Sequence, residues 1–227
     1  MTDQLATAVQ PAAQVLAGAT PSTAVKLFLL ITALSFASAL VVCVTSFARI
    51  VIVMSFLRQA LGTPQLPPNQ VLIGLSLFLT VFIMAPTARR VHQEALQPLL
   101  QDRIGVVEAG DRAAGPLREF MLRQTREADL RLFYDISSTP RPTRGDAVPM
   151  TIVVPAFMVS ELTTAFRMGL FLFIPLIVVD LLVSAVLMSL GMMMVPPNMI
   201  SLPLKVGVFL LADGWHLVVG SLARSFQ

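Results

Sequence analysis

Apolar positions along the chain gather into four long blocks. These blocks cover residues 27–57, 71–88, 168–195 and 199–222. A helix needs about 20 apolar residues to cross a bilayer, so the pattern predicts four membrane-type helices. Three of the blocks are interrupted by charges, which are Arg49, Asp180, Lys205 and Asp213. A charge in the bilayer centre is costly unless it is paired or faces a cavity, so these helices are expected to pack against protein as well as lipid.

Two turns with similar sequences join these blocks in pairs. Residues 61–69 read LGTPQLPPN and residues 190–198 read LGMMMVPPN, so Leu-Gly and Pro-Pro-Asn recur at the same offsets. Glycine and proline favour the end of a helix. The pattern predicts two hydrophobic helical hairpins with proline-stiffened tips, in residues 27–88 and 148–227. The two turns are either a true internal repeat or a chance recurrence of Pro-Pro.

A polar segment, residues 89–147, separates the two hairpins. It holds 19 of the 29 charged residues of the chain, so most of the solvated surface is expected here. Within it, residues 116–133, PLREFMLRQTREADLRLF, predict one continuous helix that begins at Pro116, because charges of alternating sign recur every four residues. Residues 1–26 are rich in Ala, Thr and Pro and predict a weakly ordered lead-in or an uncertain signal.

Composition places the chain in the membrane class and disfavours several functions. It is 56% hydrophobic and 13% charged, against roughly a quarter charged in soluble domains. The net charge is +3, but acidic residues accompany the basic ones, so no nucleic-acid site is predicted. One cysteine, Cys43, and two distant histidines predict no disulfide and no metal site. No nucleotide or acyl-transfer motif occurs, so neither a cofactor nor an enzyme is expected.

Four long strings carry a specific resemblance. They are TSFARIVIV through VFIMAP (residues 45–86), PLREFMLRQTREADLRLF (116–133), VPAFMVSELTTAF (154–166) and IPLIVVDLLV through LLADGW (174–215). All four resemble the FliP family of the flagellar type III export gate, which is related to the SctR subunits of virulence secretion systems. The resemblance runs from about residue 27 to the C-terminus.

The resemblance implies an all-α subunit that assembles into a ring or helical cone. Five copies are implied, together with FliQ and FliR, the assembly factor FliO, and the export proteins FlhB and FlhA. The implied location is the bacterial inner membrane at the flagellar basal body, in contact with lipid. Unfolded flagellar proteins would pass through the gate.

Three adjacent methionines, Met192, Met193 and Met194, lie between Gly191 and the second Pro-Pro. Methionine is apolar and flexible, so it adapts its shape to what it touches. If several copies present these side chains toward one axis, they can close a pore and still yield to a passing polypeptide. The resemblance implies this pore-gasket role, and ordinary core packing is the alternative.

The resemblance also implies a pore constriction at Phe120, Phe133 and Glu161. The two phenylalanines are 13 residues apart, about 220° around a continuous helix at 100° per residue. They can face one axis only if the helix bends or breaks. The alternatives are ordinary core aromatics for the phenylalanines and, for Glu161, an ion pair with Arg167 or with a neighbouring subunit.

The charges within the apolar blocks are predicted to make buried contacts between helices. Lys205 and Asp213 are eight residues apart, close to one helical face, and can pair between subunits. Asp180 is expected to contact a partner helix, and Arg49, close to Ser46, is expected to do likewise. Charges within membrane helices, together with a possible repeat, also favour an alternative function, an ion or solute transporter.

Overall fold

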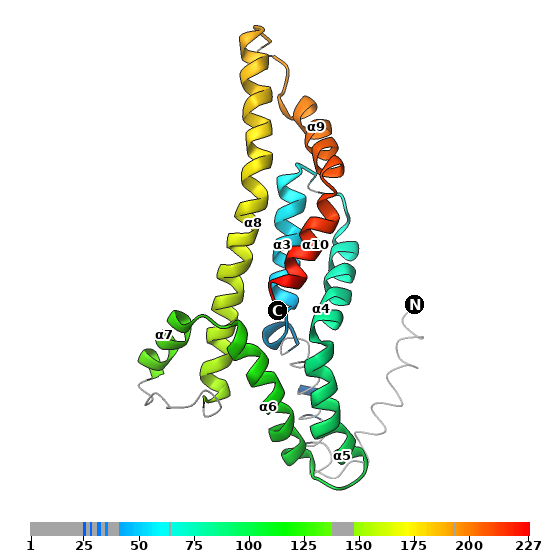
Figure 1. The fold of residues 1–227 in the computed structure, drawn as a ribbon, viewed down its shortest axis with the longest axis vertical. Coiled ribbons are helices and arrows are strands. Elements are labelled where there is room, and N and C mark those ends of the chain that lie inside the picture. The colour runs from blue at the N-terminus through cyan, green and yellow to red at the C-terminus, as the bar shows by residue number, and fades with distance from the viewer. Residues whose placement is uncertain are drawn as a thin grey trace, which may run out of the picture. The chain divides into compact units, whose positions relative to one another are not determined.

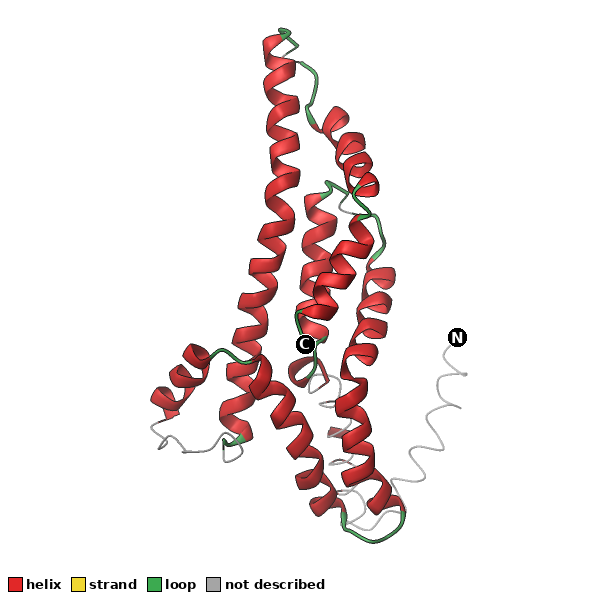
Figure 2. Cartoon of the chain, in the orientation of Figure 1, coloured by secondary structure: helices red, strands yellow, loops and turns green. Residues whose placement is uncertain are grey.

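The computed structural model describes residues 25, 28, 31–32, 35, 41–63, 65–137, 148–192 and 194–227. The account below concerns the compact unit from Val42 to Gln227. Within the described ranges the regular structure is helical and contains no strand, which confirms the all-α prediction (Figure 2). Apart from Val25, the lead-in predicted for residues 1–26 lies outside the described residues, as does Met193.

Figure 1 shows the helices of the described part. In chain order they are α3 (Phe47–Ala60), α4 (Asn69–Val91), the π-helix η1 (His92–Leu96), α5 (Gln97–Leu100), α6 (Val106–Gln124), α7 (Glu127–Ser137), α8 (Met150–Ser189), α9 (Asn198–Leu211) and α10 (Gly214–Arg224). Helices α4, η1 and α5 form one unbroken helical segment from Asn69 to Leu100. The π-helix lies just before Pro98, whose nitrogen cannot donate a hydrogen bond to the preceding turn.

Two helices of the described part are long and apolar enough to cross a membrane. They are Asn69–Leu100 and Met150–Ser189, and α9 with α10 passes the same test as one pair bent by 63°. The sequence predicted four such helices. The difference arises at the first block, where α3 has only 14 residues and most positions before Val41 lie outside the described residues.

Helix α8 divides into a packed half and an exposed half. Its 40 residues extend about 60 Å, twice the roughly 30 Å of a bilayer's hydrocarbon core. The buried positions of the first half recur at helical spacing and are Ile152, Val153, Ala156, Phe157, Ser160, Glu161, Ala165 and Gly169. In the second half only Leu176, Val183 and Leu187 are buried. Helix α8 is therefore anchored at its base and open to other molecules near its tip.

Two apolar clusters hold this base together. One cluster joins α3, α4, α8 and α10 around Ile50, Val53, Met54 and Leu57 of α3. The second joins α4, α6, α7 and α8 around Phe120, Met121, Tyr134 and Phe157. Helix α3 is short and packs along α8, so it lies in the interior of the base.

The two predicted tips end their first helices with the same turn. Gly62 has φ of 76° and Gly191 has φ of 74°, a left-handed conformation that glycine adopts without steric cost. At the second tip, the Gly191 amide donates to the Met188 carbonyl and the Met192 amide donates to the Leu187 carbonyl. The first tip repeats this pair of bonds from Gly62 and Thr63 to Gln59 and Arg58. Both are Schellman caps, which satisfy carbonyl groups at a helix end.

The helix predicted for residues 116–133 is wrong in its bounds. Two helices, α6 and α7, take its place, and Thr125 between them has an extended backbone. Pro116 lies inside α6 instead of at its first turn. The break follows from side-chain contacts: the Arg126 amide donates to Ser160 Oγ of α8 at 2.9 Å instead of continuing the helix.

Substitution of Gly169 tests how closely α3 and α8 pack. An added Cβ at Gly169 would lie 2.6 Å from two ring atoms of Phe56. We expect Gly169→Ala to lower the free energy of unfolding by about 1–3 kcal/mol, the usual cost of overpacking. Thermal unfolding in detergent, followed by circular dichroism, measures the change.

The matched control is Gly74→Ala on α4, where an added Cβ meets nothing within 4 Å. Alanine in an open helical position reduces the entropy of the unfolded chain, so this variant should be neutral or more stable by about 0.4–1 kcal/mol. Equal behaviour of the two variants would show that α3 and α8 are not this close.

Candidate functional site

A buried guanidinium lies at the centre of the base. Arg49 of α3 is 2% exposed and Glu161 of α8 is fully buried. Arg49 Nε donates to Glu161 Oε2 at 2.9 Å, and Nη2 donates to Glu161 Oε1. This bidentate geometry is the one that a planar guanidinium and a carboxylate favour. Because both charges are removed from water, each needs the other.

The rest of the Arg49 side chain holds the C-terminus. Nη1 donates to the carbonyl oxygen and to Oγ of Ser225, both at 3.0 Å. The guanidinium carbon lies 3.8 Å from the centre of the Phe226 ring, within the range of a cation–π contact. Gln124 of α6 closes the network, since it accepts from Arg49 Nη2 at 3.3 Å and donates to the Phe226 carbonyl at 3.1 Å. One side chain thus joins α3, α6, α8 and the end of α10.

Ser160, the neighbour of Glu161, anchors the other side of α8. Its hydroxyl donates to Asp129 Oδ2 of α7 at 2.5 Å and accepts from the Arg126 amide. Arg126 in turn donates to both carboxylate oxygens of Asp129, at 2.8 and 2.9 Å, and to Thr163 Oγ1 at 3.0 Å. Adjacent residues of α8 therefore fix the start of α7 and the position of α3.

A second buried cation joins α9 to α3 and α8. Lys205 Nζ lies 2.5 Å from Asp180 Oδ2 and donates to the Ala60 carbonyl at 3.1 Å. The Ala60 carbonyl belongs to the last turn of α3, where the helix dipole also favours a cation. The other carboxylate oxygen of Asp180 is buried and has no hydrogen-bond partner among the described residues. Asp180 also lines a cavity of about 210 Å³, together with Gln59 and Ser201.

Two charges find their partners within the chain. Glu161 pairs with Arg49 and not with Arg167, and Lys205 pairs with Asp180. The pairing of Lys205 with Asp213 between subunits stays a prediction. In the single chain the Asp213 side chain is 78% exposed. The reason is local: Asp213 has φ of 50° at the bend between α9 and α10, which takes it off the face that carries Lys205.

Phe120 and Glu161 are interior residues of the folded chain. Phe120 is 4% exposed, and its ring centre lies 6.0 Å from that of Phe157 and 6.3 Å from that of Phe226. Neither side chain reaches the surface of the single chain, and the constriction role, which concerns an assembled gate, stays a prediction. Phe133 is partly buried on α7, beside the same cluster. The break before α7 places the two phenylalanines on separate helices.

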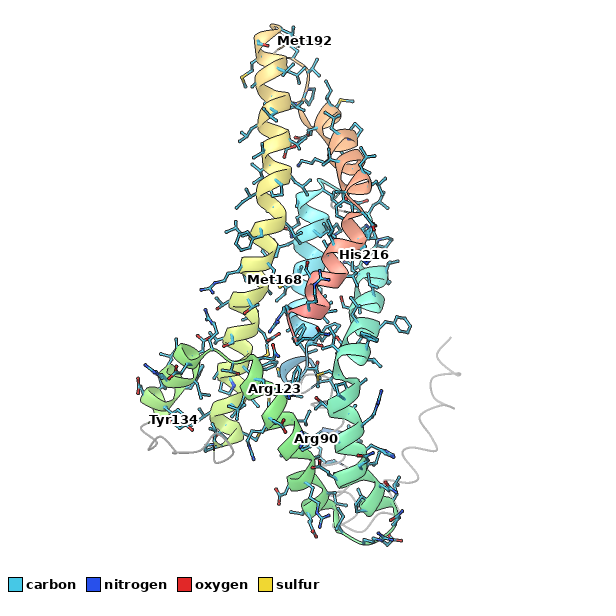
Figure 3. The ribbon with its side chains drawn as sticks, in the orientation of Figure 1. Arg90, Arg123, Tyr134, Met168, Met192 and His216 are labelled. Atoms are coloured by element: carbon cyan, nitrogen blue, oxygen red, sulfur yellow. The ribbon has the colours of Figure 1, made fainter. Side chains whose placement is uncertain are left out.

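Met192 lies at the tip between α8 and α9, at the opposite end of α8 from Arg123 and Tyr134 (Figure 3). Met194 is 96% exposed and Met192 is 44% exposed. Met188 and Met199, just before and after the tip, are also exposed. The tip therefore presents a group of thioether side chains that the fold of the single chain does not bury.

Sequence reasoning missed Arg126, Asp129, Gln124 and Ser225 as structural residues. Asp129 is 7% exposed, and a buried carboxylate that accepts three hydrogen bonds is a strong constraint. In the sequence Asp129 looks like one more charge on a solvated helix. The only signal was the adjacent polar pair Ser160-Glu161 within an otherwise apolar block.

One titrating group on α6 and one on α7 have shifted pKa values. The pKa of Glu119 on α6 is lowered, chiefly by its hydrogen bond with Arg90. Tyr134 on α7 is buried, and burial raises its pKa because the phenolate would lose its hydration. Among the described residues the Tyr134 hydroxyl has no hydrogen-bond partner, so no contact there compensates that loss.

The Arg49–Glu161 pair can be tested by a double-mutant cycle. Arg49→Met leaves a buried carboxylate without its cation, so we expect a loss of about 3–5 kcal/mol in the free energy of unfolding. The double variant Arg49→Met/Glu161→Met should be more stable than Arg49→Met alone, because no unpaired charge remains. The control is Arg131→Met, whose partner Glu127 is 76% exposed, with an expected loss below about 1 kcal/mol. Strict additivity in the cycle would contradict the pairing.

Tyr134→Phe is expected to be neutral or stabilising, because it removes a buried hydroxyl that has no partner. The pKa of Tyr134 is higher in the folded state than in the unfolded state. Ionisation of Tyr134 therefore leaves the free energy of unfolding unchanged below the usual pKa of about 10 and lowers it as pH rises above that value. The chain has one tyrosine, so ultraviolet absorbance during an alkaline titration reports on this residue alone. A substantial loss of stability in Tyr134→Phe at neutral pH would show that the hydroxyl has a partner.

Comparison with known proteins identifies the family. A profile of the FliP family matches residues 30–222. The flagellar biosynthetic protein FliP of Pectobacterium carotovorum subsp. carotovorum is 55% identical over 202 residues, covering 89% of this chain and 78% of that protein. FliP of Bacillus subtilis (strain 168) is 51% identical over 205 residues, covering 90% of this chain and 93% of that protein. FliP of Aquifex aeolicus (strain VF5) is 47% identical over 205 residues, covering 89% of this chain and 86% of that protein. The chain that buries Arg49 against Glu161 and carries an exposed methionine tip belongs to the FliP family.

Proposed function

We propose that this protein is a pore-forming subunit of the flagellar type III export gate, a structural component of the export apparatus and not an enzyme. It would pass unfolded flagellar subunits across the bacterial inner membrane at the flagellar basal body. Family membership and the two membrane-capable helices support this proposal. The observation that carries it is the exposed methionine tip.

The tip has the properties that a compliant seal needs. Its backbone is held by the Schellman cap at Gly191 and by Pro196 and Pro197, while the side chains of Met192 and Met194 are exposed. A fixed backbone holds the side chains at one place, and unbranched thioethers adapt to different neighbours. We propose Met192, Met193 and Met194 as a gasket that limits leakage through the closed gate.

One copy alone cannot enclose a pore, so the gate requires assembly. Large apolar side chains are exposed along α4 and along the second half of α8, including Phe78, Phe82, Phe171 and Leu181. Exposed apolar surface of this extent marks contacts with protein or lipid. We propose that further copies, five in all, cover part of this surface together with FliQ and FliR, that FliO assists assembly, and that FlhB and FlhA work with the gate.

An ion or solute transporter is the second candidate function. The observation in its favour is the cavity that Asp180 lines together with Gln59 and Ser201. Against it, Lys205 already neutralises Asp180 within the chain. The two functions differ in a measurable way, because a transporter should move solute in vesicles by itself and a gate should remain shut.

Native mass spectrometry of the full chain in gentle detergent tests the proposal. We expect a discrete assembly of about five times the 24.6 kDa chain mass, which then binds the neighbouring gate subunits on co-expression. A stable monomer that binds none of them, and that moves ions or solutes in vesicles, would favour the transporter.

A methionine variant separates assembly from sealing. Met192→Ala/Met193→Ala/Met194→Ala should keep the assembly mass and raise ion leakage of the reconstituted gate several-fold, because the small side chains leave the axis open. The control Met192→Leu/Met193→Leu/Met194→Leu retains apolar volume and should leak less than the alanine variant. Equal leakage of the wild-type and alanine proteins would remove the gasket role.

A further inference from the structure

An apolar groove lies beside the methionine tip, between the end of α8 and α9. It has a volume of about 410 Å³. All of its lining side chains are apolar, and they are Leu182, Val183, Val186, Leu187, Leu190, Met192, Ile200 and Leu204. The groove is open, and six of these eight residues keep a large exposed fraction. The single chain therefore leaves a hydrophobic hollow directly beside its most exposed methionine.

Met194 has no place in the groove of its own chain. It is 96% exposed and does not line the groove. A fully exposed thioether and an unfilled apolar hollow within the same tip are two complementary surfaces, one protruding and one recessed. Both gain if Met194 of one copy enters the groove of another.

Lipid is a poor occupant for this groove. The tip that borders it is irregular backbone, with a left-handed Gly191 followed by Pro196 and Pro197. Irregular backbone is not found exposed to lipid in the hydrocarbon region, because its polar groups would lack partners there. A tip of this kind lies outside the hydrocarbon or against protein, which places the adjoining groove away from acyl chains.

We infer that Met194 of one copy docks into the α8–α9 groove of the neighbouring copy. This inference rests on the proposed function, because it needs several copies with their tips together. The contact joins different residues on its two sides, so it is heterologous, and a chain of such contacts closes into a ring when the rotation between copies allows it. Met194 would then add one contact at the tip to an assembly that the wider apolar surfaces of α4 and α8 hold together, in addition to any sealing role.

The inference gives Met192 and Met194 different tasks. Met192 lines the groove, and so helps to receive the neighbour's side chain. Met194 is the side chain that enters it. Opening the gate would require each Met194 to leave its groove. Because every contact is apolar and shape-adaptable, a Met194 side chain can leave and re-enter without breaking any hydrogen bond or ion pair.

Site-directed cross-linking between two tagged copies tests this contact. Both copies carry Cys43→Ser, which removes the only native thiol. One tagged copy carries Met194→Cys, and the other carries Leu204→Cys in the groove. A short bismaleimide is added to the full-length proteins after co-expression. Only a contact between copies can give a product with both tags, so linkage within one chain is not counted.

The control copy carries Phe78→Cys on α4 in place of Leu204→Cys. Phe78 is 78% exposed and does not line the groove, so its thiol is at least as accessible to reagent. We expect the doubly tagged product from Met194→Cys with Leu204→Cys to exceed that with Phe78→Cys at least fivefold. Native mass spectrometry of each pair, before cross-linking, records whether the ring has formed.

The outcomes separate this inference from the proposed function. A ring with the groove-specific product supports both. A ring with no product, or with equal products for the groove and α4 positions, overturns the Met194 contact and leaves the gate standing. A ring with phospholipid bound in the groove, lost on Leu204→Trp, also overturns the contact. A protein that forms no oligomer overturns the gate proposal and the contact together.

Discussion

The buried guanidinium of Arg49 is the interaction on which the base of the molecule depends. It joins α3 to Glu161 of α8, to Gln124 at the end of α6 and to Ser225 after α10. These partners lie 75 to 176 positions away from Arg49 in the chain. A buried ion pair by itself contributes little net stability, because the loss of hydration offsets the attraction. Its value here is specificity, since this arrangement of α3 and α8 pairs both charges and their separation would leave each one buried without a partner.

From this anchor follows the unequal division of α8. Its first half carries Ser160 and Glu161, which fix α7 and α3 through hydrogen bonds. The second half carries one charge, Asp180, and that charge is matched by Lys205 of α9. Polar contacts thus position α9 along α8 without covering the apolar face that both helices present. A rigid base and an uncovered tip are what a subunit needs if its partners assemble around the tip.

The sequence predicted the parts of this structure that depend on neighbouring residues. The apolar blocks, the helix ends at Gly62 and Gly191, and the helical character of the polar segment all follow from local pattern. The pairing of charges could not be predicted, because Arg167 is six positions from Glu161 and Arg49 is 112 away, and nothing in a single sequence ranks a distant partner above a near one. The break at Thr125 was not predicted for the same reason, since it depends on a hydrogen bond with Ser160 of another helix. The burial of Phe120 depends on Phe226 at the chain's end.

Comparison of the two tips shows what the methionines are not needed for. Both tips form the same Schellman cap, with Thr63 at the position of Met192 and exposed Gln65 at the position of Met194. At the first tip Thr63 Oγ1 donates to the Leu66 carbonyl at 2.7 Å, so a polar side chain serves the turn itself. The turn therefore forms without methionine, and a polar side chain is the favourable one at a position that faces water. Met194 occupies the position that Gln65 has in the first tip, and its apolar side chain is 96% exposed. Such exposure is consistent with contact to another apolar surface that the single chain does not provide.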